Sequence, residues 1–333
     1  FQNIYGLEKS HGMLSLIRGS YSMQKKLLSI VTPCYNEEQN IYELYSRIIE
    51  VINTIPKYDF EIIVIDNSST DGSLEILKNL ASMDKRLKVI ENMRNFGHIR
   101  SPYYGILASS GEATIYLASD LQDPPEKIPE FIKWWEEGYK LVQGVKPESK
   151  SSVLFHFIRK YYYRTLDKIS DTPLLNDATG FGLYDKEVLN QLRMINDPYP
   201  YLRGLICELG YKIKKVEFVQ DARKRGITKN NLYTLFDIGM LGVVNHSKLP
   251  LRIASFSGLA LGLTSILIAL VYFIMKIIYW DSFAMGMAPL IIGIFFIFGV
   301  LMISIGILGE YVISMHRYLQ NRPIVVEKQR INF

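Results

Sequence analysis

Two long uncharged runs near the carboxyl end interrupt an otherwise ordinary pattern of hydrophobic and polar residues. Residues 253–275 and 282–309 contain no charged side chain, and both are rich in Leu, Ile and Phe. About 20 apolar residues in a helix span the roughly 30 Å hydrocarbon core of a bilayer. The pattern therefore predicts a hairpin of two transmembrane helices over 251–315, and it excludes a purely soluble protein.

Upstream of the hairpin, short hydrophobic runs alternate with segments of helical period. The runs that predict β-strands are 27–32, 60–66, 87–90 and 113–118. The segments with apolar residues at helical spacing include 39–55 and 73–83. Strands that alternate with helices are typical of a mainly parallel sheet with helices on both faces. The sequence thus predicts an α/β domain.

Charge places this domain relative to the membrane. The chain has 333 residues and a formal net charge of +5. Lys248 and Arg252 precede the first apolar run, and Arg317 and Arg322 follow the second, whereas the short connection between the runs carries few charges. By the positive-inside rule, the α/β domain and both chain termini should face the cytoplasm, in a multi-pass protein of the plasma (inner) membrane.

These patterns divide the chain into five parts. They are an N-terminal extension or expression remnant at 1–24, a cytosolic domain at 25–228, a juxtamembrane interfacial helix at 229–250, the hairpin at 251–315 and a cytosolic tail at 316–333. The apolar run Ile324-Val325-Val326 suits the tail to add a strand to a neighbour's sheet. Cys34 and Cys207 have no metal-site spacing, and we expect free thiols in a reducing compartment.

Polar clusters follow three of the predicted strands. In open parallel sheets, ligands bind beyond the carboxyl ends of the strands. The clusters are TPCYNEE at 32–38, DNSSTDG at 66–72 and SDLQDPPE at 119–126. Helix caps, Asx turns and an acidic loop before a proline-initiated helix are the structural alternatives. If the fourth strand persists, Asp120 and Gln122 point to one face and could hold a divalent cation together with a diphosphate.

The order of the motifs resembles a known family. The strings TPCYNEE, IDNSSTDGS, RNFGH, SDLQDPPE and GFGLYD, followed by paired apolar helices, resemble the family 2 glycosyltransferases of the dolichyl-phosphate mannose synthase type. The bacterial polyprenyl-phosphate (bactoprenol) glucosyltransferases are the most similar group. The resemblance runs from Leu27 to about Tyr318. It implies a GT-A (Rossmann-like) fold, a UDP-sugar donor, a divalent cation (Mg²⁺ or Mn²⁺) and a polyprenyl-phosphate acceptor.

The resemblance also implies roles for particular residues. The nucleotide-sugar would be bound by Pro33, Tyr35, Glu37 and Asp66, with Asp66 at the base. Asp120 and Gln122 would be catalytic, holding the metal and the diphosphate. Asp177 would be a third catalytic residue, contacting a sugar hydroxyl or the acceptor; a turn aspartate is the alternative. Arg223 and Lys229 would bind the acceptor phosphate or the pyrophosphate of the donor, with attraction to lipid headgroups as the alternative.

This sequence departs from the family pattern at two of the motif positions. The family usually reads Asp-Ala-Asp-Leu-Gln after the fourth strand and Asp-Asp-Gly-Ser after the second. Here the first aspartate of the former is Ala118, and the second aspartate of the latter is Asn67. The loss of a carboxylate at Ala118 removes one anionic contact near the ribose or the metal.

The chemistry of the acceptor favours direct transfer. A phosphate monoester has a second pKa of about 6, so it is already an anionic nucleophile at neutral pH and needs no general base. We therefore expect inverting transfer of a hexose, with glucose as the first choice, to undecaprenyl or polyprenyl phosphate. The alternatives are another sugar (mannose or aminoarabinose), a processive polysaccharide synthase, and a catalytically weak membrane scaffold. The Gln-x-x-Arg-Trp element of processive synthases is absent from the sequence.

Two expectations concern partners. The resemblance implies a homo-oligomer, possibly a tetramer. Nucleic-acid binding is not expected, because the basic residues cluster at the membrane edge instead of interleaving with aromatic residues on an exposed face.

Overall fold

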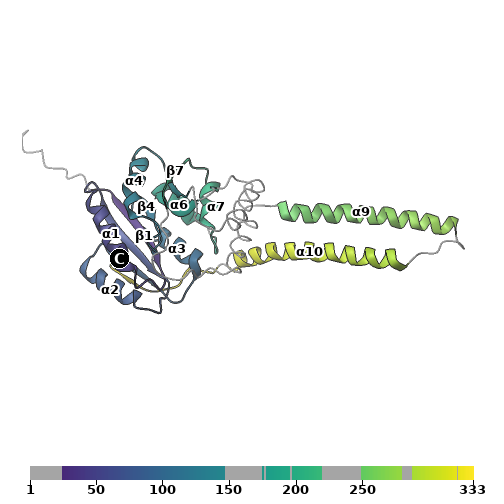
Figure 1. Cartoon of the computed structure of the whole chain (residues 1–333), viewed down its shortest axis with the longest axis horizontal. Coiled ribbons are helices and arrows are strands. Elements are labelled where there is room, and N and C mark those ends of the chain that lie inside the picture. Colours follow the sequence, from purple (N-terminus) through teal and green to yellow (C-terminus); the bar gives the residue numbers. More distant parts are fainter. Residues whose placement is uncertain are drawn as a thin grey trace, which may run out of the picture.

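An eight-stranded sheet flanked by helices, with two long helices beyond it, makes up the part of the chain that the computed structural model describes (Figure 1). The described residues are 25–146, 175, 178–195, 197–219, 249–279, 287–320 and 322–333. Residues 229–248 of the interfacial helix predicted at 229–250 and the N-terminal extension at 1–24 lie outside them.

The sheet is mainly parallel. Its strands are β1 (Leu27–Cys34), β2 (Asp59–Asp66), β3 (Leu87–Asn92), β4 (Ala113–Tyr116), β5 (Leu141–Val145), β6 (Ala178–Asp185), β7 (Ile213–Glu217) and β8 (Glu327–Ile331). They lie in the order β7-β5-β6-β4-β1-β2-β3-β8. Strand β1 is parallel to β2 and β4, β2 to β3, and β5 to β7, whereas β6 and β8 are antiparallel to their neighbours. The four strands predicted from sequence are confirmed.

Helices cover both faces of this sheet. The helices are α1 (Ile41–Asn53), α2 (Ser73–Met83), α3 (Gly97–Leu107), α4 (Ile128–Glu136), α6 (Lys186–Met194) and α7 (Leu202–Glu208). Helices α1, α2 and α4 bury their apolar residues with Ile30 and Ile62 of the sheet, whereas α3, α6 and α7 pack with Val31 and Ile63. Because neighbouring residues of one strand face two cores, the central strands are nearly continuous apolar runs.

The chain ends on the domain, beyond the last long helix. After α10 (Met287–Leu319), residues 322–326 lead into β8, which pairs antiparallel with β3 at one edge of the sheet. The amide of Met93 donates to the carbonyl of Val326 at 2.9 Å, and Lys328 Nζ donates to the buried Glu91 carboxylate at 2.6 Å. The tail thus adds a strand as predicted, but the strand begins after the apolar run 324–326 and extends the sheet of its own domain, so the predicted pairing with a neighbour's sheet was wrong for this chain.

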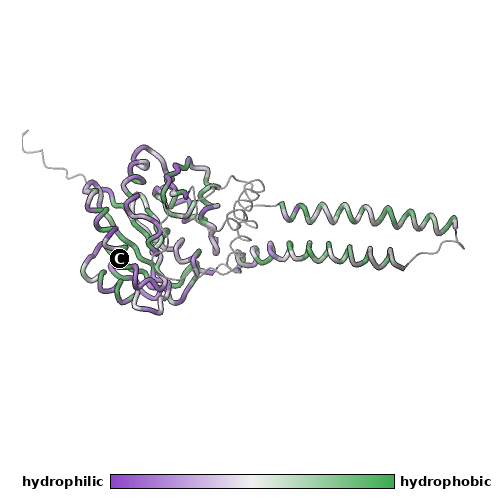
Figure 2. Tube along the Cα trace, viewed as in Figure 1, coloured by the Kyte–Doolittle hydropathy of each residue, from purple (hydrophilic) through white to green (hydrophobic). Residues whose placement is uncertain are grey.

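Helices α9 (Leu249–Ile278) and α10 run side by side away from the domain (Figure 1). Both are apolar over most of their length (Figure 2). Segments Leu249–Ile268 and Phe296–His316 are long and apolar enough to cross a membrane, and their side chains are not buried within the protein. The two predicted apolar helices are confirmed, and their exposed apolar surface is typical of membrane association.

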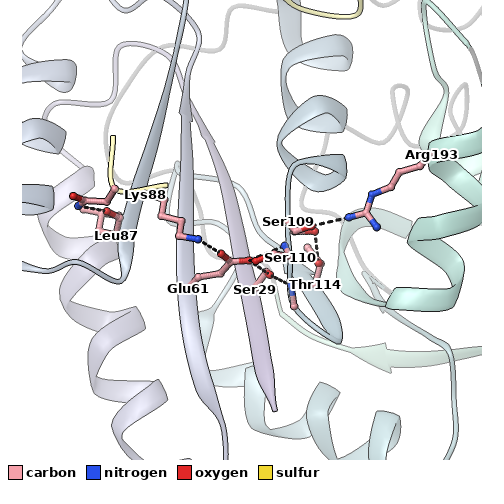
Figure 3. A network of polar contacts seen from close by, with 10 residues as sticks. Ser29, Glu61, Leu87, Lys88, Ser109, Ser110, Thr114 and Arg193 are labelled. Atoms are coloured by element: carbon pink, nitrogen blue, oxygen red, sulfur yellow. Dashed lines mark hydrogen bonds and ion pairs between the residues drawn. The ribbon is translucent and has the colours of Figure 1, made fainter. Parts of the chain in front are cut away.

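A buried carboxylate joins the sheet to the end of α3 (Figure 3). Glu61 on β2 is only 3% exposed and accepts hydrogen bonds from Ser29 and from the backbone and side chain of Ser110. Lys88 on β3 donates to its second oxygen at 2.6 Å. Burial alone would raise the pKa of this carboxyl, but these hydrogen bonds outweigh burial and hold the pKa below its ordinary value.

We expect Glu61→Gln to lower the free energy of unfolding at neutral pH by roughly 2–4 kcal/mol, because it leaves the partly buried Lys88 without its counter-charge. Since the folded-state pKa of Glu61 is depressed, its contribution is present above the unfolded pKa and is lost as the pH falls through the folded pKa. The stability difference from wild type should therefore shrink in acid. Thermal unfolding of the full-length protein in detergent, measured at several pH values, checks this.

Glu112→Gln is the matched control for Glu61→Gln. Glu112 and Lys186 form an ion pair at 2.8 Å in which both side chains are 46% exposed. Exposed pairs of this kind contribute about 0–1 kcal/mol, so the control should unfold close to the wild-type temperature. Equal unfolding temperatures for the two variants would contradict a stabilising role of the Glu61 network.

Candidate active site

The end of β1 is locked to the loop that follows β2. Asn36 has a φ of 57°, in the left-handed region, and its amide donates to Ser69 Oγ at 3.0 Å. The side chain of Asn36 accepts from the amide of Thr70 at 2.7 Å. Pro33 lies within β1, opposite Ile65, instead of in the turn after the strand. The two loops therefore form one rigid unit that carries the predicted residues Tyr35 and Glu37.

Glu37 is partly committed to holding this unit together. Its amide donates to Ser73 Oγ at 2.8 Å, and one of its carboxylate oxygens accepts from Asn40 Nδ2 at 2.6 Å. Tyr35 and Glu37 are both half-buried on this unit. The arrangement leaves Glu37 a structural role at the start of α1, whatever it contacts in a ligand.

Asp66, the last residue of β2, is a buried carboxylate with incomplete hydrogen bonding. It is 0% exposed, and its Oδ2 accepts from the amide of Ser69 at 3.1 Å. Its Oδ1 is buried and has no hydrogen-bond partner among the described residues. Burial is the main cause that raises the pKa of this carboxyl, helped by the nearby charge of Glu91 and opposed by the hydrogen bonds from Ser69. A buried acceptor without a partner is costly for folding and is a common mark of a ligand site.

Asn67 has a structural role that the sequence did not reveal. Its side-chain nitrogen donates to Asn95 Oδ1 at 2.9 Å, and its side-chain oxygen accepts from Asn92 Nδ2 at 3.1 Å and from the amide of Phe96 at 2.9 Å. The contacts with the 92–97 loop thus require an asparagine here, because the carboxylate of the family's aspartate could not donate a hydrogen bond to Asn95.

The loop after β4 differs from the prediction. Strand β4 ends at Tyr116, so Asp120 and Gln122 do not alternate along a strand. Leu121 between them has a φ of 62°, which is rare for a bulky residue, and Asp120 Oδ1 accepts from the amide of Gln122 at 3.2 Å. Asp120 and Gln122 are therefore brought together by a tight turn, and both remain partly exposed.

Asp123 stabilises this turn, a role that was not predicted from the sequence. Its Oδ2 accepts from the amide of Ala118 at 3.0 Å, and the residue is 4% exposed. Burial, together with the neighbouring charge of Asp120 and against the hydrogen bond from Ala118, raises the pKa of Asp123 to about 6. Its position five residues after Ala118, just before two prolines, is a sequence signal for such a closed loop.

The loops after β1, β2 and β4 lie side by side at the carboxyl ends of these three neighbouring strands. Strand β1 lies between β2 and β4, so the ends of β2 and β4 are two strand spacings apart, roughly 10 Å. Each loop holds one non-glycine residue in the left-handed region, namely Asn36, Ser68 and Leu121. Backbone strain of this kind gathers at binding and catalytic sites. The predicted residues Tyr35, Glu37, Asp66, Asp120 and Gln122 are thus brought to a common edge.

The donor set at this edge fits a cation that is shared with a ligand. Among the described residues, no three His, Cys, Asp or Glu side chains converge as a metal cage would require. Asp120 and Gln122 nevertheless supply a carboxylate and an amide oxygen on one turn, which are hard donors. Mg²⁺-like ions are commonly held by one or two carboxylates plus substrate phosphates, so the residues fit such an ion.

Three predicted site residues, namely Asp177, Arg223 and Lys229, lie outside the described residues. Their roles stay predictions.

Comparisons with known proteins agree with this geometry. The model of glycosyl transferase family 2 matches residues 29–193. The glycosyltransferase YkcC of Bacillus subtilis (strain 168), whose function is uncharacterized, is 33% identical over 90% of this chain and 92% of its own length. A prophage-derived bactoprenol glucosyl transferase of Shigella flexneri is 30% identical over 91% of this chain and 97% of its own length.

The chain is also similar to solved structures. Glucosyl-3-phosphoglycerate synthase from Mycobacterium tuberculosis shares 20% identity with a TM-score of 0.44, covering 66% of this chain and 78% of that chain. The family match, together with the mainly parallel sheet, confirms the predicted GT-A fold class. Because the similarity to YkcC covers 90% of this chain, it reaches beyond the sheet domain into the apolar helices. The chain therefore belongs to glycosyl transferase family 2.

Proposed function

We propose that this protein transfers glucose from UDP-glucose to a polyprenyl phosphate, with inversion at the anomeric carbon, at the cytoplasmic face of the membrane. The strongest support is that one chain carries both parts that such a reaction needs. Asp66 and Asp120 lie at the ends of nearby strands, and two helices are apolar enough to reach a lipid substrate. The Shigella flexneri relative, named as a bactoprenol glucosyl transferase, supports the choice of sugar and acceptor.

The spacing of the strand ends supports a nucleoside diphosphate as the ligand. A ligand that reaches from Asp66 to Asp120 crosses roughly 10 Å along the edge of the sheet. In our proposal, Oδ1 of Asp66 accepts from the N–H of the uracil base, which supplies the hydrogen bond that this buried oxygen lacks. Pro33, Tyr35 and Glu37 line the nucleoside, and the diphosphate lies over the turn that contains Asp120.

Asp120 and Gln122 would hold a divalent cation, Mg²⁺ or Mn²⁺, against the diphosphate. When bound, such an ion neutralises the charge that develops on the departing diphosphate. The tight turn at Leu121 presents the Asp120 carboxylate and the Gln122 amide together, and Asp123 holds the turn closed through the amide of Ala118. The protein's part in this step is to fix these oxygens in advance, so that little reorganisation is needed during reaction.

The transfer itself needs no protein base. An oxygen of the acceptor phosphate attacks the anomeric carbon of the sugar, and the bond from that carbon to the diphosphate oxygen breaks with its electron pair leaving on UDP. Arg223 and Lys229 are proposed to hold the acceptor phosphate against the like-charged donor, and Asp177 to contact a sugar hydroxyl or the acceptor. One direct displacement gives inversion.

We propose that the domain and both termini are cytoplasmic, because basic residues flank the two apolar helices on the domain side. A green fluorescent protein fused after Phe333 should fluoresce in bacterial cells, and an alkaline phosphatase fused there should be inactive. Active phosphatase at this position would mean that the C-terminus is not cytoplasmic, and the proposed orientation would be wrong.

A donor panel tests the proposed reaction. The purified full-length protein in detergent receives undecaprenyl phosphate, a divalent cation and one donor: UDP-glucose, UDP-galactose, GDP-mannose or UDP-aminoarabinose. We expect UDP-glucose alone to give a lipid whose mass rises by one anhydrohexose, with the anomer opposite to that of the donor. The Asp120→Asn variant is the matched control.

Other outcomes of the panel separate the alternatives. Product from GDP-mannose or UDP-aminoarabinose would replace glucose as the sugar. Long chains of added sugar would indicate a processive synthase. Nucleotide binding without any lipid product would support a membrane scaffold and overturn the proposed reaction.

A further inference from the structure

Three arginines gather where the loop before α3, α3 itself and the C-terminal tail meet. The guanidinium carbons of Arg94 and Arg100 lie 4.1 Å and 5.2 Å from the centroid of the Phe96 ring. Arg100 also donates to the carbonyl of Pro323 at 2.6 Å, directly after Arg322 in the tail. We call Arg94, Arg100 and Arg322 the arginine cluster.

The arginine cluster carries positive charge without a matching negative one. Among the described residues, none of its three guanidinium groups forms an ion pair with a carboxylate. Nε of Arg100 is buried and has no hydrogen-bond partner in that part of the chain. Burial first, and then the charge of Arg94, lower the pKa of Arg100; Tyr199 opposes them, and Arg322 adds a smaller lowering. Like charges held together are unfavourable unless an anion joins them.

The arginine cluster lies at the membrane end of the domain. Candidate span Phe296–His316 lies in α10, whose last residue is Leu319, and Arg322 follows three residues later. Burial, helped by the nearby Asp197 carboxylate of the domain, raises the pKa of Tyr318 near the end of α10, and Arg100 of α3 contacts Pro323 just after α10. The stretch from His316 to Arg322 reaches at most about 15 Å, which places Arg322 in or next to the headgroup layer, some 5–8 Å thick on each side of the bilayer.

We propose that the arginine cluster is a binding site for the phosphate of an anionic bilayer phospholipid. Arginine forks bind phosphate oxygens through two N–H donors at once, and Phe96 holds the Arg94 and Arg100 guanidinium groups in place. The lipid phosphate supplies the negative charge that the cluster lacks and fixes α3 and the tail to the bilayer surface. The inference uses the membrane placement of α10 and does not depend on sugar transfer.

A phosphate at the arginine cluster is too far from the proposed reaction centre to be the acceptor. The cluster follows β3, whereas Asp120 follows β4, and the order β4-β1-β2-β3 places three strand spacings between them. Three spacings are roughly 14 Å, which is several times the distance over which an attacking oxygen must approach. The geometry therefore favours a structural phospholipid over the polyprenyl phosphate.

Native mass spectrometry of the full-length protein tests this proposal directly. The protein, in detergent, is titrated with phosphatidylglycerol and separately with phosphatidylcholine of the same chain length, without donor or acceptor. The test variant changes Arg94, Arg100 and Arg322 to Gln. We expect it to bind phosphatidylglycerol roughly 10-fold more weakly than wild type, or weaker still, and to bind phosphatidylcholine as wild type does.

A control variant removes the same charge elsewhere. It changes Arg47, Arg86 and Arg330 to Gln, each of which pairs with a carboxylate in the described structure. Its affinity for phosphatidylglycerol should match wild type. An equal loss in both variants would mean general attraction between charges and would overturn the site.

A single-residue variant and a kinetic measurement complete the test. Arg322→Gln alone, at an exposed position in the tail, should weaken phosphatidylglycerol binding severalfold without lowering the unfolding temperature. This single variant covers the case in which the triple variant does not fold. If cluster variants instead raise the KM for undecaprenyl phosphate and leave phosphatidylglycerol binding unchanged, the cluster belongs to the acceptor and the proposal is wrong. Because lipid binding is read without turnover, failure of the proposed transferase reaction would not affect it.

Discussion

Replacing Asp120 with Asn should reduce the kcat of glucose transfer by roughly 100- to 1,000-fold, because the departing diphosphate would lose the carboxylate that holds its counter-ion. Asn retains an oxygen that can accept from the amide of Gln122, so the turn at Leu121 should persist. The unfolding temperature should therefore stay near that of wild type. Initial rates of lipid product formation at saturating UDP-glucose and undecaprenyl phosphate measure the effect.

Glu130→Gln is the control for Asp120→Asn. Glu130 lies on α4, a short distance along the chain, and pairs on the surface with Lys127 at 2.8 Å. Its neutralisation removes the same charge and should leave the kcat unchanged. Near-normal turnover of Asp120→Asn would place the cation on another carboxylate, and Asp123 would then be the first to test.

Replacing Asp66 with Asn should raise the KM for UDP-glucose by roughly 10- to 150-fold, the range for losing a hydrogen bond to a charged group, because the one amide oxygen of Asn would stay with the amide of Ser69 and its NH2 group would face the N–H of the base. The same change should leave the unfolding temperature unchanged or raise it. The reason is that Asp66 is fully buried and one of its oxygens has no partner among the described residues, so its ionised form is costly to fold. Kinetics over a range of donor concentrations and a thermal unfolding curve measure both effects.

Asp84→Asn should behave in the opposite way. Asp84 accepts from Tyr45 at 2.8 Å and forms an ion pair with Arg86 at 2.9 Å. It lies just before the amino end of β3, away from the carboxyl ends of the strands where the site is. Its neutralisation should lower the unfolding temperature slightly and leave the KM for the donor unchanged. If Asp66→Asn behaved like Asp84→Asn, Asp66 would be a structural residue and the proposed base contact would be wrong.

Elements with a strong local pattern were predictable from sequence. The predicted strand at 60–66 and the helix at 73–83 correspond closely to β2 and α2, because their apolar residues alone determine which face is buried. The apolar helices α9 and α10 were predictable for the same reason. The edge at which the site residues gather also followed, since parallel strands bring their carboxyl ends together.

Features that depend on long-range pairing were harder to predict. Nothing near Glu327 in the sequence indicates that its strand pairs with a strand as far away along the chain as the one that ends at Asn92. Strand β4 stops at Tyr116 because the following residues close into a turn held by Asp123, and that turn depends on the backbone conformation of Leu121. Propensity gives no sign of such a conformation, because a leucine rarely adopts it.

Asn67 shows how a departure from a family motif can mislead. In the sequence, Asn67 is only a departure from the family's aspartate next to Asp66, and nothing there indicates what it contacts. The structure assigns the Asn67 amide to Asn92, Asn95 and Phe96, where both its donor and its acceptor are used. The residue type at this position is set by the 92–97 loop, so the loop and Asn67 are expected to change together in relatives.

The short connection between α10 and β8 limits how far the sheet can move from the hairpin. Helix α10 ends at Leu319 and β8 begins at Glu327, so seven residues join them and reach at most about 25 Å when fully extended. The amide of Met93 and the side chain of Arg100 hold this stretch against the domain through the carbonyls of Val326 and Pro323. A tilt of the domain relative to α10 would therefore pivot near the β3–β8 edge and would move the opposite edge, at β7, the furthest.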